Sequence, residues 1–179
     1  ILNLLKKHKQ KKIYIVNDGL KDRSHKISHD LTRNFIINFK KKNSHVNIIL
    51  AKKNLTQKKN LPYALKILFK KNKEAIILED DCIPNKDFFK FVNILLSKYA
   101  NDKRIAQISG VNLINHRGFK RRNNDSYFFS KFTSSWGWAT WKDRWMNLYD
   151  ENILNWPKVK RENWLNDILI NKKSVDFWK

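Results

Sequence analysis

The sequence of 179 residues holds a single cysteine, Cys82, so no disulfide bond can form within the chain. A chain without disulfides fits a reducing compartment such as the cytoplasm. Its uncharged stretches, such as residues 105–116, are shorter than the roughly 18–20 apolar residues that a membrane-spanning helix needs. Its first residues also lack the pattern of a secretory signal peptide. We therefore expect one domain, residues 1–179, without a membrane span.

Acidic residues are also scarce, because 16 Asp and Glu face 38 Lys and Arg and leave a formal net charge of +22. Such a charge is typical of proteins that bind nucleic acid, and a basic nucleic-acid-binding protein is one hypothesis for this chain. Lysine pairs, however, recur along the whole sequence, for example at positions 11–12, 58–59 and 172–173. We interpret them as a solvated, lysine-rich surface, which would also attract anionic membranes or an anionic sugar donor.

Apolar runs alternate with helical patterns over the first 110 residues, which predicts an α/β fold with a mostly parallel sheet and flanking helices. Strands are predicted at residues 12–19, 46–51, 75–78 and 104–110. Helices are predicted at residues 2–9, 27–39, 61–70 and 85–99. The second helix has an apolar residue at every fourth position, from Ile27 to Phe39, and Ser24 or Ser28 as its expected cap. Asn85 is expected to cap the last helix.

The character of the sequence changes after Gly110. Residues 112–125 are polar and irregular, and residues 127–129 are a further predicted strand. Trp138, Trp141 and Trp145 then follow at helical spacing, which is more typical of core residues than of a ligand platform. Trp136 stands beside Gly137, where a glycine would allow close approach of a ligand to the backbone, so Trp136 is the better site candidate.

Three consecutive carboxylates, Glu79, Asp80 and Asp81, follow the apolar run at residues 75–78. Like charges this close disfavour one another's ionisation, and a bound cation would remove that cost. Hard carboxylate oxygens suit Mg²⁺ or Mn²⁺, which typically bridge to substrate phosphates. Because a strand alternates its side chains, we expect Glu79 and Asp81 to project to one face and Asp80 to the other. The alternative interpretation is a polar strand terminus or a group of helix-capping charges.

Three segments in the same order resemble the GT-A-fold glycosyltransferases, and most of all the N-acetylglucosaminyltransferase I-like group. They are YIVNDG (residues 14–19), AIILEDDCIPNKDFFKFVNILLSKYANDKRIAQISGVN (residues 75–112) and YFFSKFTSSWGWATWKDRW (residues 127–145). The resemblance extends over roughly residues 12–150. It implies a nucleotide-sugar-binding α/β part at residues 1–110 and an acceptor-side aromatic part at residues 111–179.

The resemblance also implies roles for single residues. Asp81 would coordinate the divalent cation, Mn²⁺ or Mg²⁺, that holds the donor's diphosphate. Asp80 and Glu79 would contact the ribose and the sugar of the donor, and Asp18 would accept a hydrogen bond from the nucleotide base. The floor on which donor sugar and acceptor meet is implied at Trp136, Gly137 and Trp138.

Several of these residues have a simpler interpretation. Asp18 precedes Gly19, and an Asp-Gly pair is most often a turn. His25 and His29 share one face of a helix, but no third ligand at metal-binding spacing accompanies them, so no zinc site is expected. Cys82 is expected to be a small buried residue rather than a nucleophile.

Two elements of the family pattern are not found in the sequence: the first strand with its nucleotide-binding loop, and the segment that carries the catalytic Asp. We therefore expect a fold that is incomplete at both ends, with the general base beyond residue 179. The interpretation we favour is an inverting glycosyltransferase that moves a sugar from a metal-bound nucleoside-diphosphate sugar, for example a UDP-sugar, to a glycan hydroxyl. A metal-dependent nucleotidyltransferase and the nucleic-acid-binding protein are the alternatives. The resemblance implies a surface-glycan role in the cytoplasm, at or near the inner membrane.

Overall fold

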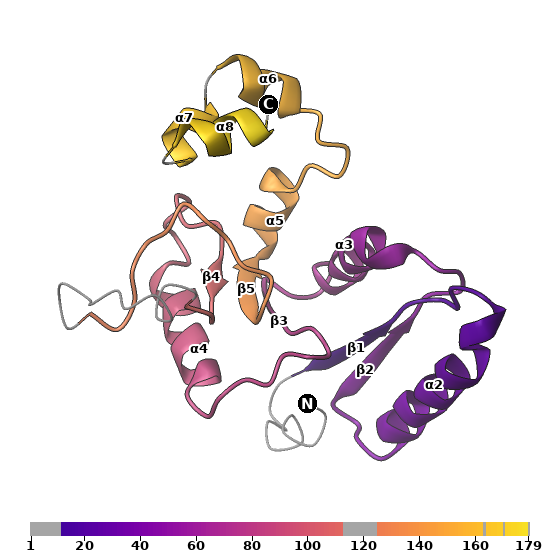
Figure 1. Cartoon of the computed structure of the whole chain (residues 1–179). Coiled ribbons are helices and arrows are strands. Elements are labelled where there is room, and N and C mark those ends of the chain that lie inside the picture. Colours follow the sequence, from indigo (N-terminus) through magenta and orange to yellow (C-terminus); the bar gives the residue numbers. More distant parts are fainter. Residues whose placement is uncertain (1–11, 113–124, 163, 170, 179) are drawn as a thin grey trace. The chain divides into compact units, whose positions relative to one another are not determined.

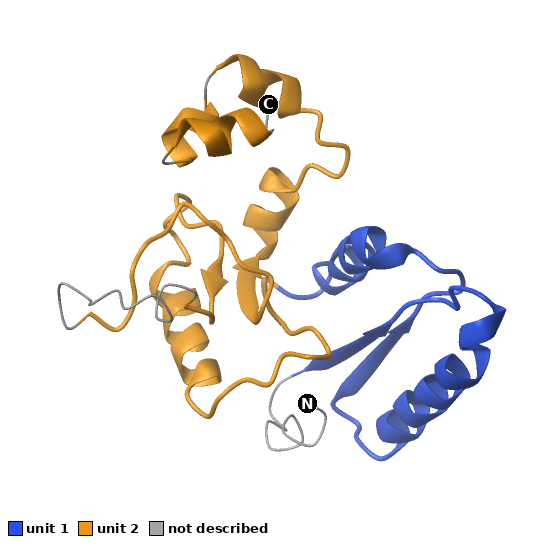
Figure 2. Cartoon of the chain, viewed as in Figure 1, with its two compact units in different colours: residues 1–72 blue, residues 73–179 orange. Residues whose placement is uncertain are grey.

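The computed structural model describes residues 12–112, 125–162, 164–169 and 171–178. The helix predicted at residues 2–9 and most of the irregular stretch at residues 112–125 lie outside the described residues. The chain divides into two compact units, Ile1–Asn72 and Lys73–Lys179 (Figure 2).

Unit 1 is a β–α–β unit followed by a helix (Figure 1). Strand β1 (Ile13–Asn17) leads through the short 3₁₀ helix η1 (Arg23–His25) into α2 (Lys26–Lys41). Strand β2 (Val46–Leu50) pairs with β1 in parallel, and α3 (Thr56–Leu68) follows. Both strands, the helix between them and their parallel pairing were predicted from the sequence. Ile13, Phe39 and Val46 form the buried contact between α2 and the two strands.

Helix α2 differs from the prediction in its start and in how much of its apolar row is buried. Asp22, not Ser24 or Ser28, caps the chain at this point, because its carboxylate accepts a hydrogen bond from the Ser24 backbone N–H at 2.9 Å. The predicted apolar row was expected to face the core. Phe39 of that row is buried, whereas Ile27, Leu31 and Phe35 are exposed, and the other buried residue of the helix is Ile36, outside the row.

Unit 2 contains a three-stranded sheet in the order β3-β5-β4, with short helices after it. Its elements are β3 (Glu74–Ile77), α4 (Phe88–Lys98), β4 (Ile108–Ser109), β5 (Trp138–Trp141), α5 (Lys142–Leu148), α6 (Trp156–Arg161), α7 (Trp164–Ile168) and α8 (Lys172–Trp178). Helix α4 packs on one face of this sheet, where Val92 and Leu96 meet Ala139 and Trp141.

The sheet of unit 2 corrects the prediction of a mostly parallel sheet. Strand β5 lies between β3 and β4 and runs antiparallel to both, so these two predicted strands do not pair with each other. Trp138 and Trp141 lie in this strand rather than in a helix, although both are buried as expected. Residues 127–129 are not a strand. The described chain is therefore a mixed α/β structure with a small parallel sheet and a small antiparallel sheet.

The C-terminal end of α4 is closed by side chains from β5 and α5. The Trp141 indole N–H donates to the Leu96 carbonyl at 3.2 Å. The buried Arg144 guanidinium donates to the carbonyls of Tyr99, Ala100 and Asp102 at 2.9, 2.8 and 3.1 Å. A cation at this position also meets the negative end of the helix dipole. These bonds fix α4 relative to β5. In the described residues, no helix is long and apolar enough to cross a membrane.

Candidate functional site

The three acids of the sequence motif lie in a turn rather than in the strand. Strand β3 ends at Ile77, and the Cys82 N–H donates to the Glu79 carbonyl at 3.1 Å. This bond closes a β-turn with Asp80 and Asp81 at its two central positions. The expected alternation of the acids across a strand is therefore wrong. Glu79 is half-buried, whereas Asp80 and Asp81 are exposed.

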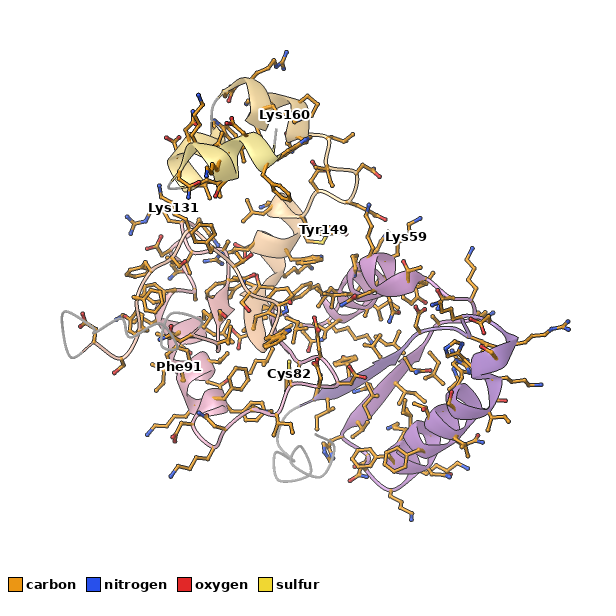
Figure 3. All side chains as sticks on the ribbon, in the orientation of Figure 1. Lys59, Cys82, Phe91, Lys131, Tyr149 and Lys160 are labelled. Atoms are coloured by element: carbon orange, nitrogen blue, oxygen red, sulfur yellow. The ribbon has the colours of Figure 1, made fainter. Side chains whose placement is uncertain are left out.

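A groove of about 1340 Å³ runs through unit 2 beside this turn, and we call it the unit 2 groove. On the side of the acidic turn it is lined by Asp81, Cys82 and Asn85. The Asn85 side-chain oxygen accepts from the backbone N–H groups of Asp87 and Phe88 at 3.1 and 2.9 Å, so Asn85 holds the turn that leads into α4. The N-cap position of the helix itself is Asp87 rather than the predicted Asn85. Figure 3 shows Cys82 in the connection between β3 and α4. The cysteine was expected to be buried, but it is half-buried and its thiol lies 3.7 Å from Asp81 Oδ1.

The segment before β5 supplies the aromatic wall of the unit 2 groove. Exposed rings in this wall are Phe128, Phe129, Phe132 and Trp136. The segment is held by polar contacts: the Gln107 side-chain amide donates to the Ser134 carbonyl at 3.1 Å, and the Ser134 hydroxyl accepts from the Trp136 N–H at 3.3 Å. Lys131 reaches the backbone oxygen of Asp167 in α7 (Figure 3).

Two glycines shape the floor of the groove. Gly137 has a φ of +63°, a left-handed conformation that glycine adopts without strain. A Cβ on Gly110 would lie 2.3 Å from the ring of Phe88, so this close approach also needs glycine. The Gly110 N–H donates to the Gly137 carbonyl at 2.8 Å. The pair joins the end of β4 to the start of β5 beneath the groove.

The predicted residues of unit 2 thus fall into three groups. Asp81, Trp136 and Gly137 line the same groove. Glu79 and Asp80 belong to the same turn as Asp81, but their side chains are not part of the groove lining. Trp138 is buried in β5, with its ring centroid 6.0 Å from that of Trp145, so its place is in the core. The roles of all these residues toward a ligand stay predictions.

Asp18 belongs to unit 1, where its carboxylate has structural partners. Its Oδ1 accepts from the backbone N–H groups of Gly19 and Leu55 at 2.7 and 2.8 Å, and Asn54 donates to Oδ2 at 3.3 Å. These bonds tie the loop after β1 to the loop after β2. They give Asp18 a role as a turn residue, and its contact with a nucleotide base stays a prediction. Asp18 also lines a small cavity of about 250 Å³, together with His25 and His29.

The donor atoms of the unit 2 groove suit a cation that takes most of its ligands from elsewhere. No group of three His, Cys, Asp or Glu side chains gathers as a metal cage in the part of the chain that the structure describes. Asp81 offers an exposed carboxylate at the groove. Mg²⁺ is typically bound by one or two carboxylates together with substrate phosphates and water, so Asp81 fits that mode of binding.

Part of the groove lining was not predicted. Gln107, Ser109 and the rings of Phe128, Phe129 and Phe132 line the groove, but no site role was assigned to them from the sequence. The segment YFFSKFTSSW could have indicated these phenylalanine rings, because it mixes aromatic residues with hydroxyl-bearing ones. Such a composition is unusual in a buried strand, because the hydroxyl groups would need partners there.

Comparison with known proteins gives a partial match to an enzyme sequence. The chain is similar to an alpha-1,3-mannosyl-glycoprotein 2-beta-N-acetylglucosaminyltransferase of Arabidopsis thaliana, with 35% identity over 107 residues. The match covers 58% of this chain and 22% of the plant enzyme, so the chain spans about a fifth of its length. No protein-family model matches, and no solved structure gives a significant match. The match supports a relationship to glycosyltransferases.

Proposed function

We propose that the chain takes part in glycosyl transfer from a nucleoside-diphosphate sugar, and that the unit 2 groove is the place of transfer. The observation that carries this proposal is the exposed carboxylate of Asp81 in the same groove as the exposed ring of Trp136. A cation-binding carboxylate suits a diphosphate, and an aromatic face suits the apolar C–H face of a sugar ring. The similarity to a glycosyltransferase supports the same conclusion.

In this proposal Asp81 would hold Mn²⁺ or Mg²⁺ together with the diphosphate of the donor. When bound, the cation would neutralise the negative charge that develops on the leaving nucleoside diphosphate. Trp136 orients the sugar by stacking against it. The Ser109 hydroxyl accepts from the Val111 N–H at 3.4 Å and keeps its own hydrogen for a sugar oxygen. Transfer with inversion also needs a base for the acceptor hydroxyl.

The test is the thermal stability of the chain in the presence of Mn²⁺ and UDP, each alone and both together. A ligand that binds the folded state stabilises it, by about 2.7 kcal/mol at 100 times its Kd. We expect UDP with Mn²⁺ to raise the melting temperature more than either alone, and Asp81→Asn to remove this effect. The matched control is Glu151→Gln, which removes an exposed carboxylate of the same unit outside the groove.

Two results would contradict the proposal. If UDP and Mn²⁺ stabilise Asp81→Asn as strongly as the unchanged chain, the acidic turn is not the cation site. If an oligonucleotide stabilises the chain and UDP with Mn²⁺ does not, the basic surface rather than the groove carries the function. A nucleotidyltransferase would instead release pyrophosphate from a nucleoside triphosphate, so a parallel sample with UTP and Mn²⁺, assayed for pyrophosphate, tests that alternative.

A further inference from the structure

Helix α2 of unit 1 carries a row of large apolar side chains that the unit leaves exposed. Ile27, Leu31 and Phe35 are 79%, 65% and 58% exposed, and they follow one another at intervals of four residues. Residues at this spacing lie on one side of a helix. The row continues to Phe39, whose ring stacks on that of Phe35 with centroids 6.4 Å apart, but Phe39 is buried. Ile36, the other buried residue of α2, lies outside the row. The apolar row therefore enters the core at its C-terminal end and is exposed over its first three residues.

Basic residues stand at both ends of this exposed row. Arg23 and Lys26 precede or begin α2, Lys41 and Lys42 end it, and all are exposed. Asp30, an exposed residue in contact with His29, is the acidic residue within the helix sequence. A helix with an apolar row and flanking cations matches the pattern of helices that lie in the interface of a membrane.

The net charge of the chain is concentrated in the same unit. Residues 1–72 hold 19 Lys and Arg against three Asp and Glu, a formal charge of +16, whereas residues 73–179 hold 19 against 13, a formal charge of +6. The lysines were predicted to cover the whole surface, but the acids are concentrated in unit 2, and the unit boundary was needed to see this. The unit that carries the exposed apolar row is therefore also the more positively charged of the two.

We propose that this exposed face of α2 binds the surface of an anionic lipid bilayer. The cations would meet the lipid headgroups, each adding to the attraction, while the apolar row enters the boundary with the acyl chains. A second copy of the chain is a poorer occupant, because two units with a charge of +16 repel each other. Nucleic acid would satisfy the charge but not Ile27 and Leu31, which have no aromatic face for a base. The proposal is independent of the function of the unit 2 groove.

The test uses the whole chain and its co-sedimentation with vesicles of phosphatidylcholine, or of equal parts phosphatidylcholine and phosphatidylglycerol. We expect binding to the anionic vesicles and little to the neutral ones. The double variant Leu31→Gln/Phe35→Gln is expected to bind anionic vesicles about tenfold more weakly. Lys41→Gln/Lys42→Gln is expected to lose about fivefold per lysine. The matched control is Met146→Gln/Leu148→Gln, which changes two exposed apolar residues of α5 in unit 2 and is expected to bind like the unchanged chain.

Each other outcome overturns the proposal. Equal binding by Leu31→Gln/Phe35→Gln and the unchanged chain would mean that the apolar row does not contact lipid. Equal loss in the Met146→Gln/Leu148→Gln control would mean non-specific adhesion of the chain. If the unchanged chain does not bind vesicles and sediments as a dimer, whereas the double variant sediments as a monomer, the face of α2 binds a second copy of the chain. Tight binding of an oligonucleotide that the double variant retains, with no vesicle binding, would assign the charge to nucleic acid.

Discussion

At the scale of the residue, Arg144 is a charged side chain buried in the middle of unit 2. Besides its three backbone carbonyls it contacts the Asp143 carboxylate at 2.8 Å and lies over the ring of Trp141 at 4.3 Å. Arg144→Ala would leave the carbonyls at the end of α4 without donors and open a space beside Trp141. We expect the free energy of unfolding to fall by about 3 kcal/mol, as measured by urea denaturation.

The matched control for this prediction is Arg104→Ala, because the Arg104 side chain is 89% exposed and pairs with Asp102 at the surface. An exposed pair of this kind contributes little, so the free energy of unfolding should change by less than about 0.5 kcal/mol. An equal loss in the two variants would contradict the structural role given to Arg144.

Asp143 gives a prediction for the dependence of stability on pH. A hydrogen bond from Lys103 lowers the pKa of Asp143 from its ordinary 3.8 to about 2. The folded chain thus holds the ionised form more strongly than the unfolded chain does, and this stabilisation is present above about pH 4 and lost as the pH falls through 2. Lys103→Met should therefore lower the urea midpoint slightly at pH 6 and much less at pH 2. A midpoint difference that stays the same at both values would show that the bond to Asp143 does not contribute.

Gly110 and Gly137 are predicted to differ in the way that they resist substitution. Gly137→Ala places a side chain at a φ of +63°, at a cost of about 1–2 kcal/mol. Gly110→Ala forces a Cβ against the ring of Phe88, which costs about 1–3 kcal/mol. Adding Phe88→Leu should recover part of the loss in Gly110→Ala and none in Gly137→Ala. Thermal unfolding of the four variants measures this, and recovery in both backgrounds would contradict the contact.

At the scale of the element, the sequence predicted helices and strands better than their pairing. Helix α4 was recognised because Phe88, Val92 and Leu95 recur at helical spacing, and all three are buried. Strand β5 was missed because all four of its residues are buried, from Trp138 at 6% to Ala139 at 0%. A strand that is buried between two others shows no alternation of polar and apolar residues. Its two tryptophans are also three residues apart, a spacing that is typical of one face of a helix.

Helix α2 shows a second limit of sequence patterns. Its apolar row runs from Ile27 to Phe39, but the first three residues of the row are exposed and only Phe39 is buried. Periodicity identifies a helix but does not say how much of an apolar row the neighbouring strands cover. The acidic triplet shows the same difficulty, since the apolar run before it did not reveal that β3 ends at Ile77 and that a turn follows.

At the scale of the whole molecule, the sequence predicted the α/β class and singled out two residues that line the unit 2 groove. Asp81 and Trp136 were singled out by composition and resemblance, and the structure places both at the unit 2 groove. The rest of the groove depends on how β5 brings the segment before it beside α4, which no local pattern encodes. The single-domain organisation and the GT-A fold stay predictions. The match to a plant enzyme supports glycosyl transfer in general and leaves donor, cation and linkage as proposals.

The central claim is that Asp81 binds a divalent cation together with a nucleoside diphosphate. Electron paramagnetic resonance of free Mn²⁺ measures it directly, by titrating the ion into the chain with and without UDP. The account predicts weak binding of Mn²⁺ alone, tighter binding of one ion with UDP, and loss of that ion in Asp81→Asn but not in Glu151→Gln. Retention of the ion in Asp81→Asn, or no effect of UDP on Mn²⁺ binding by the unchanged chain, would contradict the account.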